Sequence, residues 1–353
     1  MTTARAKLVP HGLPCCFVQN GVDLSLTVED GLEKKTVRAK RSVIARVLSP
    51  FAVLLIALVA APQLRAGEIN LPPDARRAMA DIYGGNPAAA IPLARSIQQS
   101  EPDQPLGYLL EAEADWWNIY CAACQIKWGM IDDFNHGKRA THDAYLNLAD
   151  QVIALAKAQL AKSDTPEMHV YAGLGYALKA RVYDERDEHR NVARAGVAAR
   201  TEFLAALKLD PDMADATAGL GFYNYYVDTL SPIVKVLRFF MGIPGGNKQQ
   251  GIAQMQQGAA HGVLFAVDTR YYLAKNLRTF DLKYADALDV AQPLVQQYPH
   301  NAIFLLLVGN LNAELGRSAT ATSYFRAALD AQVPNPDCAQ RVKAIATEFL
   351  ASL

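Results

Sequence analysis

The sequence lacks runs of β-branched residues, and no segment of it is typical of a β-strand. Alanine is abundant instead, and alanine is the residue that most favours an α-helix. Hydrophobic residues make up 51% of the 353 positions, which is ample for a continuous core. Together these features predict an all-α protein.

The motifs of common catalytic and cofactor sites are also missing. No two histidines stand four residues apart, as in a helical metal site. Residues 242–248 contain glycine and lysine without the spacing of a phosphate-binding loop, so we interpret them as a turn between helices. The acidic residues 184–189 could hold a cation but are more typical of a solvated insertion. No Ser, His and Asp set stands out, and we expect no enzyme, no catalytic residue, no metal and no cofactor.

An excess of positive charge is absent too. Residues 1–66 hold nine Lys or Arg and four Asp or Glu, a net charge of +5, so the neutral total leaves −5 for residues 67–353. Nucleic-acid affinity comes mainly from neutralising phosphates with basic side chains. A mildly acidic chain without a basic stripe is therefore not expected to bind nucleic acid.

What the sequence does contain is a recurring spacing of small and large residues. Ala321, Phe325 and Ala328 lie at positions i, i+4 and i+7 and therefore share one helix face. Gly309 lies on the preceding stretch, where a missing side chain would let a second helix approach closely. Gly316 is placed to end that first helix with a left-handed cap. The pattern predicts two packed antiparallel helices.

The same spacing recurs four times upstream. In three of those sets a proline follows the leading residue by twelve positions, at Pro102, Pro211 and Pro299. The sets are Ala199, Phe203 and Ala206; Ala287, Ala291 and Leu294; Ala90, Ala94 and Ile97; and Gly251, Met255 and Gly258. Recurrence at this interval is typical of a stack of two-helix repeats.

These residues resemble the tetratricopeptide repeat (TPR) family, most closely over residues 302–335 and more broadly over 74–350. The resemblance implies a right-handed α-solenoid of antiparallel helix pairs, with inserted loops or helices. First helices would run near 168–183, 213–228, 269–281 and 302–315. About twelve extra residues, including 183–189, would separate the two helices of one unit.

The resemblance also implies a binding surface, because first helices line the concave face in this family. Tyrosine and asparagine suit adaptable recognition of a protein or peptide. Mapping that face onto this sequence gives a candidate peptide-binding groove of Tyr176, Lys179, Phe222, Tyr225, Tyr226, Tyr272, Asn276 and Asn310. The alternative is that most of these tyrosines pack between repeats. The segment 233–241 mixes apolar and basic residues, like a short helix that lies on a membrane or on the solenoid.

The first 66 residues have the layout of a leader. Basic residues at 38–41 precede an apolar run over 48–61, and Leu64, Arg65 and Ala66 follow. This order is typical of a secretory signal and predicts cleavage after Ala66 and export to the bacterial periplasm or envelope. The alternative is an uncleaved leader that anchors the chain in the inner membrane through 48–61. Residues 1–36 suggest a mispredicted translation start.

One aromatic-rich segment, 116–128, places Cys121 and Cys124 three residues apart. Haem attachment is disfavoured because Gln125 stands where that motif has histidine, and a zinc site would need a second ligand pair. Cys338 is the only other cysteine of residues 67–353. The pair is most typical of two buried thiols, and a disulfide between them is the alternative.

These observations leave three hypotheses for function. The first is a non-enzymatic scaffold of the bacterial envelope that binds a protein or peptide. The second is a structural envelope component that associates with itself as a homo-oligomer. The third is a thiol-redox or metal-binding protein that uses Cys121 and Cys124.

Overall fold

The computed structural model describes residues 69–123, 137–229, 235, 238 and 242–353. In these ranges it has thirteen α-helices and no strand, so the predicted all-α class is confirmed. The helices are α2 (Pro73–Tyr83), α3 (Pro87–Ser100), α4 (Leu106–Ala123), α5 (Thr141–Leu160), α6 (Pro166–Glu185), α7 (His189–Leu209), α8 (Ala214–Thr229), α10 (Lys248–His261), α11 (Ala266–Thr279), α12 (Tyr284–Gln297), α13 (Ala302–Glu314), α14 (Ser318–Asp330) and α15 (Pro336–Ser352).

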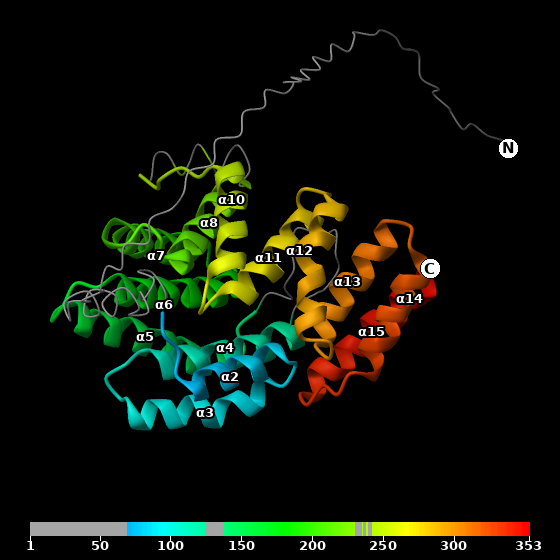
Figure 1. The fold of residues 1–353 in the computed structure, drawn as a ribbon, viewed down its shortest axis with the longest axis horizontal. Helices are drawn as coiled ribbons and strands as arrows, with labels where there is room; N and C mark the ends of the chain where they lie inside the picture. Colours follow the sequence, from blue (N-terminus) through cyan, green and yellow to red (C-terminus); the bar gives the residue numbers. More distant parts are fainter. Residues whose placement is uncertain (1–68, 124–136, 230–234, 236–237, 239–241) are drawn as a thin grey trace, which may run out of the picture. The chain divides into compact units, whose positions relative to one another are not determined.

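The helices pack as successive pairs, with α15 following the last pair (Figure 1). The pairs are α2 with α3, α4 with α5, α6 with α7, α8 with α10, α11 with α12, and α13 with α14. The four first helices that the sequence predicts correspond to α6, α8, α11 and α13, with ends that differ by at most three residues. The fold is therefore an array of helix pairs of the kind that the repeats predict.

Close approach between helices follows the small residues. A Cβ placed on Gly309 of α13 would lie 2.7 Å from the ring of Phe325 in α14, so only glycine leaves room for that ring. Phe203 of α7 occupies a similar position between two helices, because a Cβ on Gly173 or on Gly219 would overlap its ring. Gly316 ends the first helix of the last pair at φ 72°, in the left-handed region.

The other residues of these second-helix faces are also in the core. Ala199 and Ala206 flank Phe203 on α7, and Ala321 and Ala328 flank Phe325 on α14; all are buried. Aromatic rings held between alanines and glycines bring the helices of a pair close together. Bulkier side chains at these alanine and glycine positions would hold the two helices farther apart.

One structural expectation is wrong. The extra residues near 183–189 do not separate two helices, since only residues 186–188 lie between α6 and α7. They lengthen both helices, to 20 and 21 residues. Glu185, expected in a solvated insertion, is fully buried.

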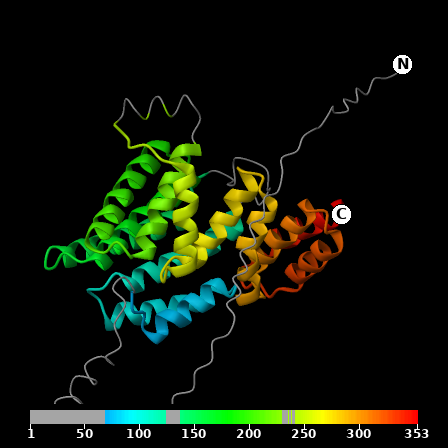
Figure 2. The same cartoon turned by 45° about the horizontal axis from the view of Figure 1, so that its top comes forward.

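Helices from the beginning and the end of the array contact each other. Helix α4, in the teal part of the chain, packs against α15, in the red part, although the two lie far apart in the colour order of Figures 1 and 2. The ring of Trp117 in α4 lies 5.6 Å from that of Phe304 in α13, edge to face. Asn301 donates from Nδ2 to the carbonyl oxygen of Tyr83 at 2.9 Å and caps the start of α13 with its Oδ1. The first helices therefore share one core.

Candidate functional site

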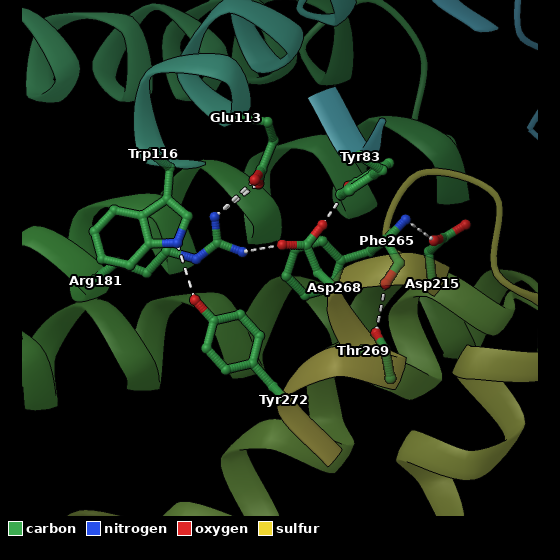
Figure 3. A network of polar contacts seen from close by, with 9 residues as sticks. All are labelled: Tyr83, Glu113, Trp116, Arg181, Asp215, Phe265, Asp268, Thr269 and Tyr272. Carbon is green, nitrogen blue, oxygen red and sulfur yellow. Dashed lines mark hydrogen bonds and ion pairs between the residues drawn. The ribbon is translucent and has the colours of Figure 1, made fainter. Parts of the chain in front are cut away.

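The most unusual site in the structure is a buried polar cluster enclosed by first helices (Figure 3). Helix α4 contributes Glu113, α6 contributes Arg181 and α11 contributes Asp268; Tyr83 reaches it from the end of α2. Charged residues are rarely fully buried unless they are paired. In this cluster, residues from four helices pair the buried charges with one another.

Arg181 is the centre of the cluster. Its Nη1 lies 2.9 and 2.8 Å from the two carboxylate oxygens of Glu113, and its Nη2 lies 3.5 Å from Oδ1 of Asp268. Two acids therefore face one base in a buried site. Removing Arg181 would leave the two carboxylates buried without a compensating charge.

The buried environment changes the pKa of Asp268. Burial, and secondarily the negative charge of Glu113, raise its pKa to about 7, although Arg181 opposes the shift. The hydroxyl of Tyr83 donates to Oδ2 of Asp268. Burial and the nearby carboxylates in turn raise the pKa of Tyr83, so this phenol stays protonated and remains a donor.

Aromatic rings surround the guanidinium of Arg181. Its central carbon lies 5.4 Å from the ring centre of Trp116 and 5.1 Å from that of Phe265. The indole Nε1 of Trp116 donates to the hydroxyl of Tyr272 at 2.9 Å, which fixes one wall of this aromatic enclosure. Such rings stabilise a cation that has lost water.

A second buried carboxylate, that of Asp215 in α8, contacts the turn that precedes α11. Asp215 accepts backbone hydrogen bonds from Val263, Leu264 and Phe265 at 3.0, 3.0 and 2.9 Å. Burial raises its pKa even though these three bonds favour the charged form. Asp215 thereby fixes the turn that leads into the helix carrying Asp268.

The arrangement holds charges in place rather than presenting them to a substrate. In the described ranges no group of three or more His, Cys, Asp or Glu side chains has the arrangement of a metal site. The residues of the cluster are each hydrogen-bonded to other helices of the chain. Its evident chemical role is to orient α2, α4, α6 and α11 relative to one another.

Four of the predicted groove residues come together between α8 and α11. The ring of Phe222 stacks on that of Tyr226 at 6.3 Å and meets that of Tyr272 edge to face at 5.9 Å. The hydroxyl of Tyr226 donates to Oδ1 of Asn276 at 3.2 Å. Tyr226 is 37% exposed, whereas Tyr272 and Asn276 are buried.

The other four predicted groove residues contact different parts of the chain. Tyr225 is fully buried and donates to Oδ2 of Asp281 at 2.9 Å. Asn310 is also buried, and its Oδ1 accepts a hydrogen bond from Nε of Arg278 at 2.8 Å. Lys179 forms an ion pair with Asp150 of α5 at 2.6 Å. Tyr176 is half-buried and packs against the core. Binding by this set stays a prediction, and Tyr226 is its most exposed member.

The sequence interpretation of the cysteines needs correction. Cys121 forms a disulfide with Cys338, across 217 positions, so it is neither a free thiol nor the partner of Cys124. Both cysteines of the bond are buried. Residue 124 lies outside the described ranges. The spacing of the cysteines could not predict this pairing, because α4 and α15 are far apart in the sequence.

A further cluster that the sequence does not reveal surrounds Glu185. Its Oε2 lies 2.9 Å from Nε2 of His142, and its Oε1 accepts from Nε of Arg139 at 2.5 Å. Nδ1 of His142 accepts from Nε of Arg186 at 3.1 Å, so Nε2 carries the proton that faces Glu185. Burial lowers the pKa of His142, which is neutral in this arrangement.

The predicted leader, residues 1–66, and the segment 233–241 lie outside the described ranges except for residues 235 and 238. Among the helices that can be described, none has the length and apolar character needed to cross a membrane.

Solved structures that resemble this chain include TPR proteins. The C-terminal part of a TPR repeat-containing protein from Cytophaga hutchinsonii is 16% identical, with 79% of this chain and 86% of that chain covered and a TM-score of 0.37. PilW, a type IV pilus biogenesis factor, is 18% identical, with 76% and 96% covered and a TM-score of 0.38. Yeast Tom70 is 8% identical, with 79% and 88% covered and a TM-score of 0.26. No protein-family model matches the chain.

Proposed function

We propose that this protein is a non-enzymatic scaffold that binds a protein or peptide partner in the bacterial cell envelope. The observation that carries the proposal is the array of helix pairs itself, whose first helices are fixed by buried ion pairs and by a disulfide. A rigid array presents surface side chains without a large ordering cost, which favours binding.

Export is the second part of the proposal. Disulfides persist in oxidising compartments such as the periplasm and are rare in the cytosol. A buried disulfide between α4 and α15 supports an oxidising location, in agreement with the signal-like layout of residues 38–66. In this proposal the mature chain begins at Gly67.

The proposed partner contact is centred on Tyr226. Its ring is 37% exposed, stacked on Phe222, and its hydroxyl is held by Asn276. A tyrosine that is already held in one conformation loses little side-chain entropy on binding. The neighbouring Tyr225 and Asn276 are buried, so changes at those two positions would test stability rather than recognition.

The compartment is tested by expressing the full chain in a bacterial host and measuring its mature N-terminus by mass spectrometry. A start at Gly67, with Cys121 and Cys338 oxidised, is the expected result. An uncleaved cytoplasmic chain with both thiols free would refute export.

Partner binding is tested by placing a photo-crosslinking amino acid at position 226 of the exported chain. A defined cross-linked protein is expected from position 226 and not from position 108, where Tyr108 is also half-buried on a first helix. The Tyr226→Ala variant should weaken binding of that partner by at least about tenfold, while Tyr108→Ala leaves it unchanged. A cross-link only to a second copy of the chain, with a mass that rises with concentration, would favour the self-associating envelope component.

A further inference from the structure

A recess of about 410 Å³ lies at the start of the array, and its lining includes neither the residues of the buried cluster nor Tyr226. It is formed where three segments meet: the beginning of α2, the turn between α3 and α4, and the first turns of α6. Its polar lining includes Arg76, Glu101, Gln104, Glu167 and Tyr171. A volume of this size falls within the range of small-molecule sites.

Tyr171 is the residue that points to a ligand. It lies on α6, is only 2% exposed and lines the recess. Its hydroxyl has no hydrogen-bond partner among the described residues, and it is not one of the fully enclosed polar atoms without a partner, so it is accessible from the recess. A polar molecule bound in the recess can therefore form a hydrogen bond with this hydroxyl.

Two carboxylates in the lining also lack partners. Neither Glu101 nor Glu167 forms an ion pair with any described residue, although both line the same recess. Burial raises the pKa of Glu167, and no nearby cation opposes that shift. Burial and the charges of Glu167 and Glu101 raise the pKa of Tyr171, which keeps its phenol neutral. A ligand with a positively charged N–H group would compensate the two carboxylates and donate a hydrogen bond to the hydroxyl oxygen of Tyr171.

Arg76 supplies the opposite charge on the α2 side. Its Nη1 donates to the carbonyl oxygen of Leu71 at 2.5 Å, which fixes the guanidinium at the recess. The side chain makes no ion pair with a described residue, so its remaining N–H groups can bind an anion. Arginine binds carboxylates through two parallel hydrogen bonds.

We propose that this recess binds a small zwitterion, a free α-amino acid or a short peptide with both termini free. The ammonium group lies against Glu101, Glu167 and the hydroxyl oxygen of Tyr171, and the carboxylate binds Arg76. The apolar part of the ligand contacts Leu71 and the prolines of the lining. This site is independent of the scaffold function and of the surface at Tyr226.

The test is calorimetric titration of the oxidised full chain with L-lysine, L-alanine and triglycine. Saturable binding of at least one of them at concentrations up to about 10 mM is expected. N-acetyl-L-alanine and L-alanine methyl ester each lack one of the two charges, and both should bind at least about tenfold more weakly than L-alanine does. Binding of triglycine alone would assign the site to peptides, and binding of the amino acids alone to free amino acids.

Variants decide whether the recess is the site. Tyr171→Phe and Glu167→Gln should each raise the dissociation constant at least about tenfold, and Arg76→Gln should do so only for ligands with a free carboxylate. Glu348→Gln, an exposed carboxylate on α15, is the matched control and should leave it unchanged. Thermal melting checks that each variant folds. No saturable binding of any probe, or equal affinity in Glu167→Gln and the unmodified chain, would overturn the proposal.

Discussion

Cys121 in α4 and Cys338 in α15 form a covalent bond between two helices that are 217 positions apart in the sequence. An open solenoid leaves its terminal repeats with neighbours on one side only. Here the last helix is bound to one of the first. Stability should therefore depend on the redox state of the protein.

Removing this bond gives the first prediction. The Cys338→Ser variant should lose about 2–5 kcal/mol of unfolding free energy, because the unfolded chain is no longer cross-linked over a long loop. Urea unfolding measures the loss. Reductant should lower the midpoint of the unmodified chain and leave that of the variant where it is. Cys124→Ser serves as the control, and a loss of equal size there would contradict the Cys121–Cys338 pairing.

The second prediction concerns the buried ion pairs. Arg181→Met should destabilise the protein by about 3–5 kcal/mol, because the carboxylates of Glu113 and Asp268 would remain buried with no cation. Arg77→Met is the control, since Arg77 is largely exposed and its ion pair, among the described residues, is with Asp74 of the same helix; its effect should stay within about 0.5 kcal/mol. Similar losses for both variants would mean that Arg181 does not compensate the two acids.

The third prediction is a pH dependence. Asp268 titrates near 3.8 in an unfolded chain and at about 7 in the fold, so between these values the folded state retains a proton that the unfolded state has released. The free energy of unfolding should therefore fall as the pH rises from 4 to 7, by up to about 1.4 kcal/mol per pH unit, and level off above that range.

The Asp268→Asn variant isolates this contribution. An amide keeps the neutral form at every pH, so the slope between pH 5 and 7 should decrease and the variant should be relatively more stable at pH 8. Asp115 contributes in the same direction, because burial and the charge of Glu111 raise its pKa to about 6. An identical pH profile in the Asp268→Asn variant would show that Asp268 is ionised throughout.

The fourth prediction tests the close packing around Phe203. Gly219→Ala would place a methyl group against this ring and should cost about 1–3 kcal/mol. The cost should shrink in a Phe203→Leu background, where the ring is gone, and a double-mutant cycle measures the coupling. Gly196→Ala, in the same helix as Phe203, meets no atom within 4 Å and should stabilise the helix by about 0.5–1 kcal/mol. Equal effects at positions 196 and 219 would refute the packing argument.

Local spacing is a good predictor of the helix pairs. The sets led by Ala90, Ala199, Ala287 and Ala321 and the glycine set led by Gly251 all fall on second helices, because one helix face needs small residues wherever another helix approaches. One pair escaped recognition. In α5 the residues Ala149, Ile153 and Ala156 have the same spacing and, as in the set led by Gly251, no proline follows the first of them by twelve positions.

The sites are harder to predict than the helices. Glu113, Arg181 and Asp268 lie on three different first helices, and each looks like an ordinary surface charge in its own segment. Their burial results from contacts between helices distant in the sequence, which no local pattern encodes. The same holds for Tyr171, since an aromatic at a core position gives no sign that its hydroxyl opens onto a recess.

The hydrogen bond from Asn301 to Tyr83 has a consequence for how the chain is made. A linear repeat array can fold from its N-terminus while synthesis continues, because each repeat needs only its neighbour. In this protein the carbonyl group of Tyr83, at the end of α2, accepts a hydrogen bond from Asn301, 218 positions later. The ring of Trp117 likewise contacts that of Phe304, which is synthesised much later. The contacts at the end of α2 and around Trp117 can therefore be completed only when most of the chain has been synthesised.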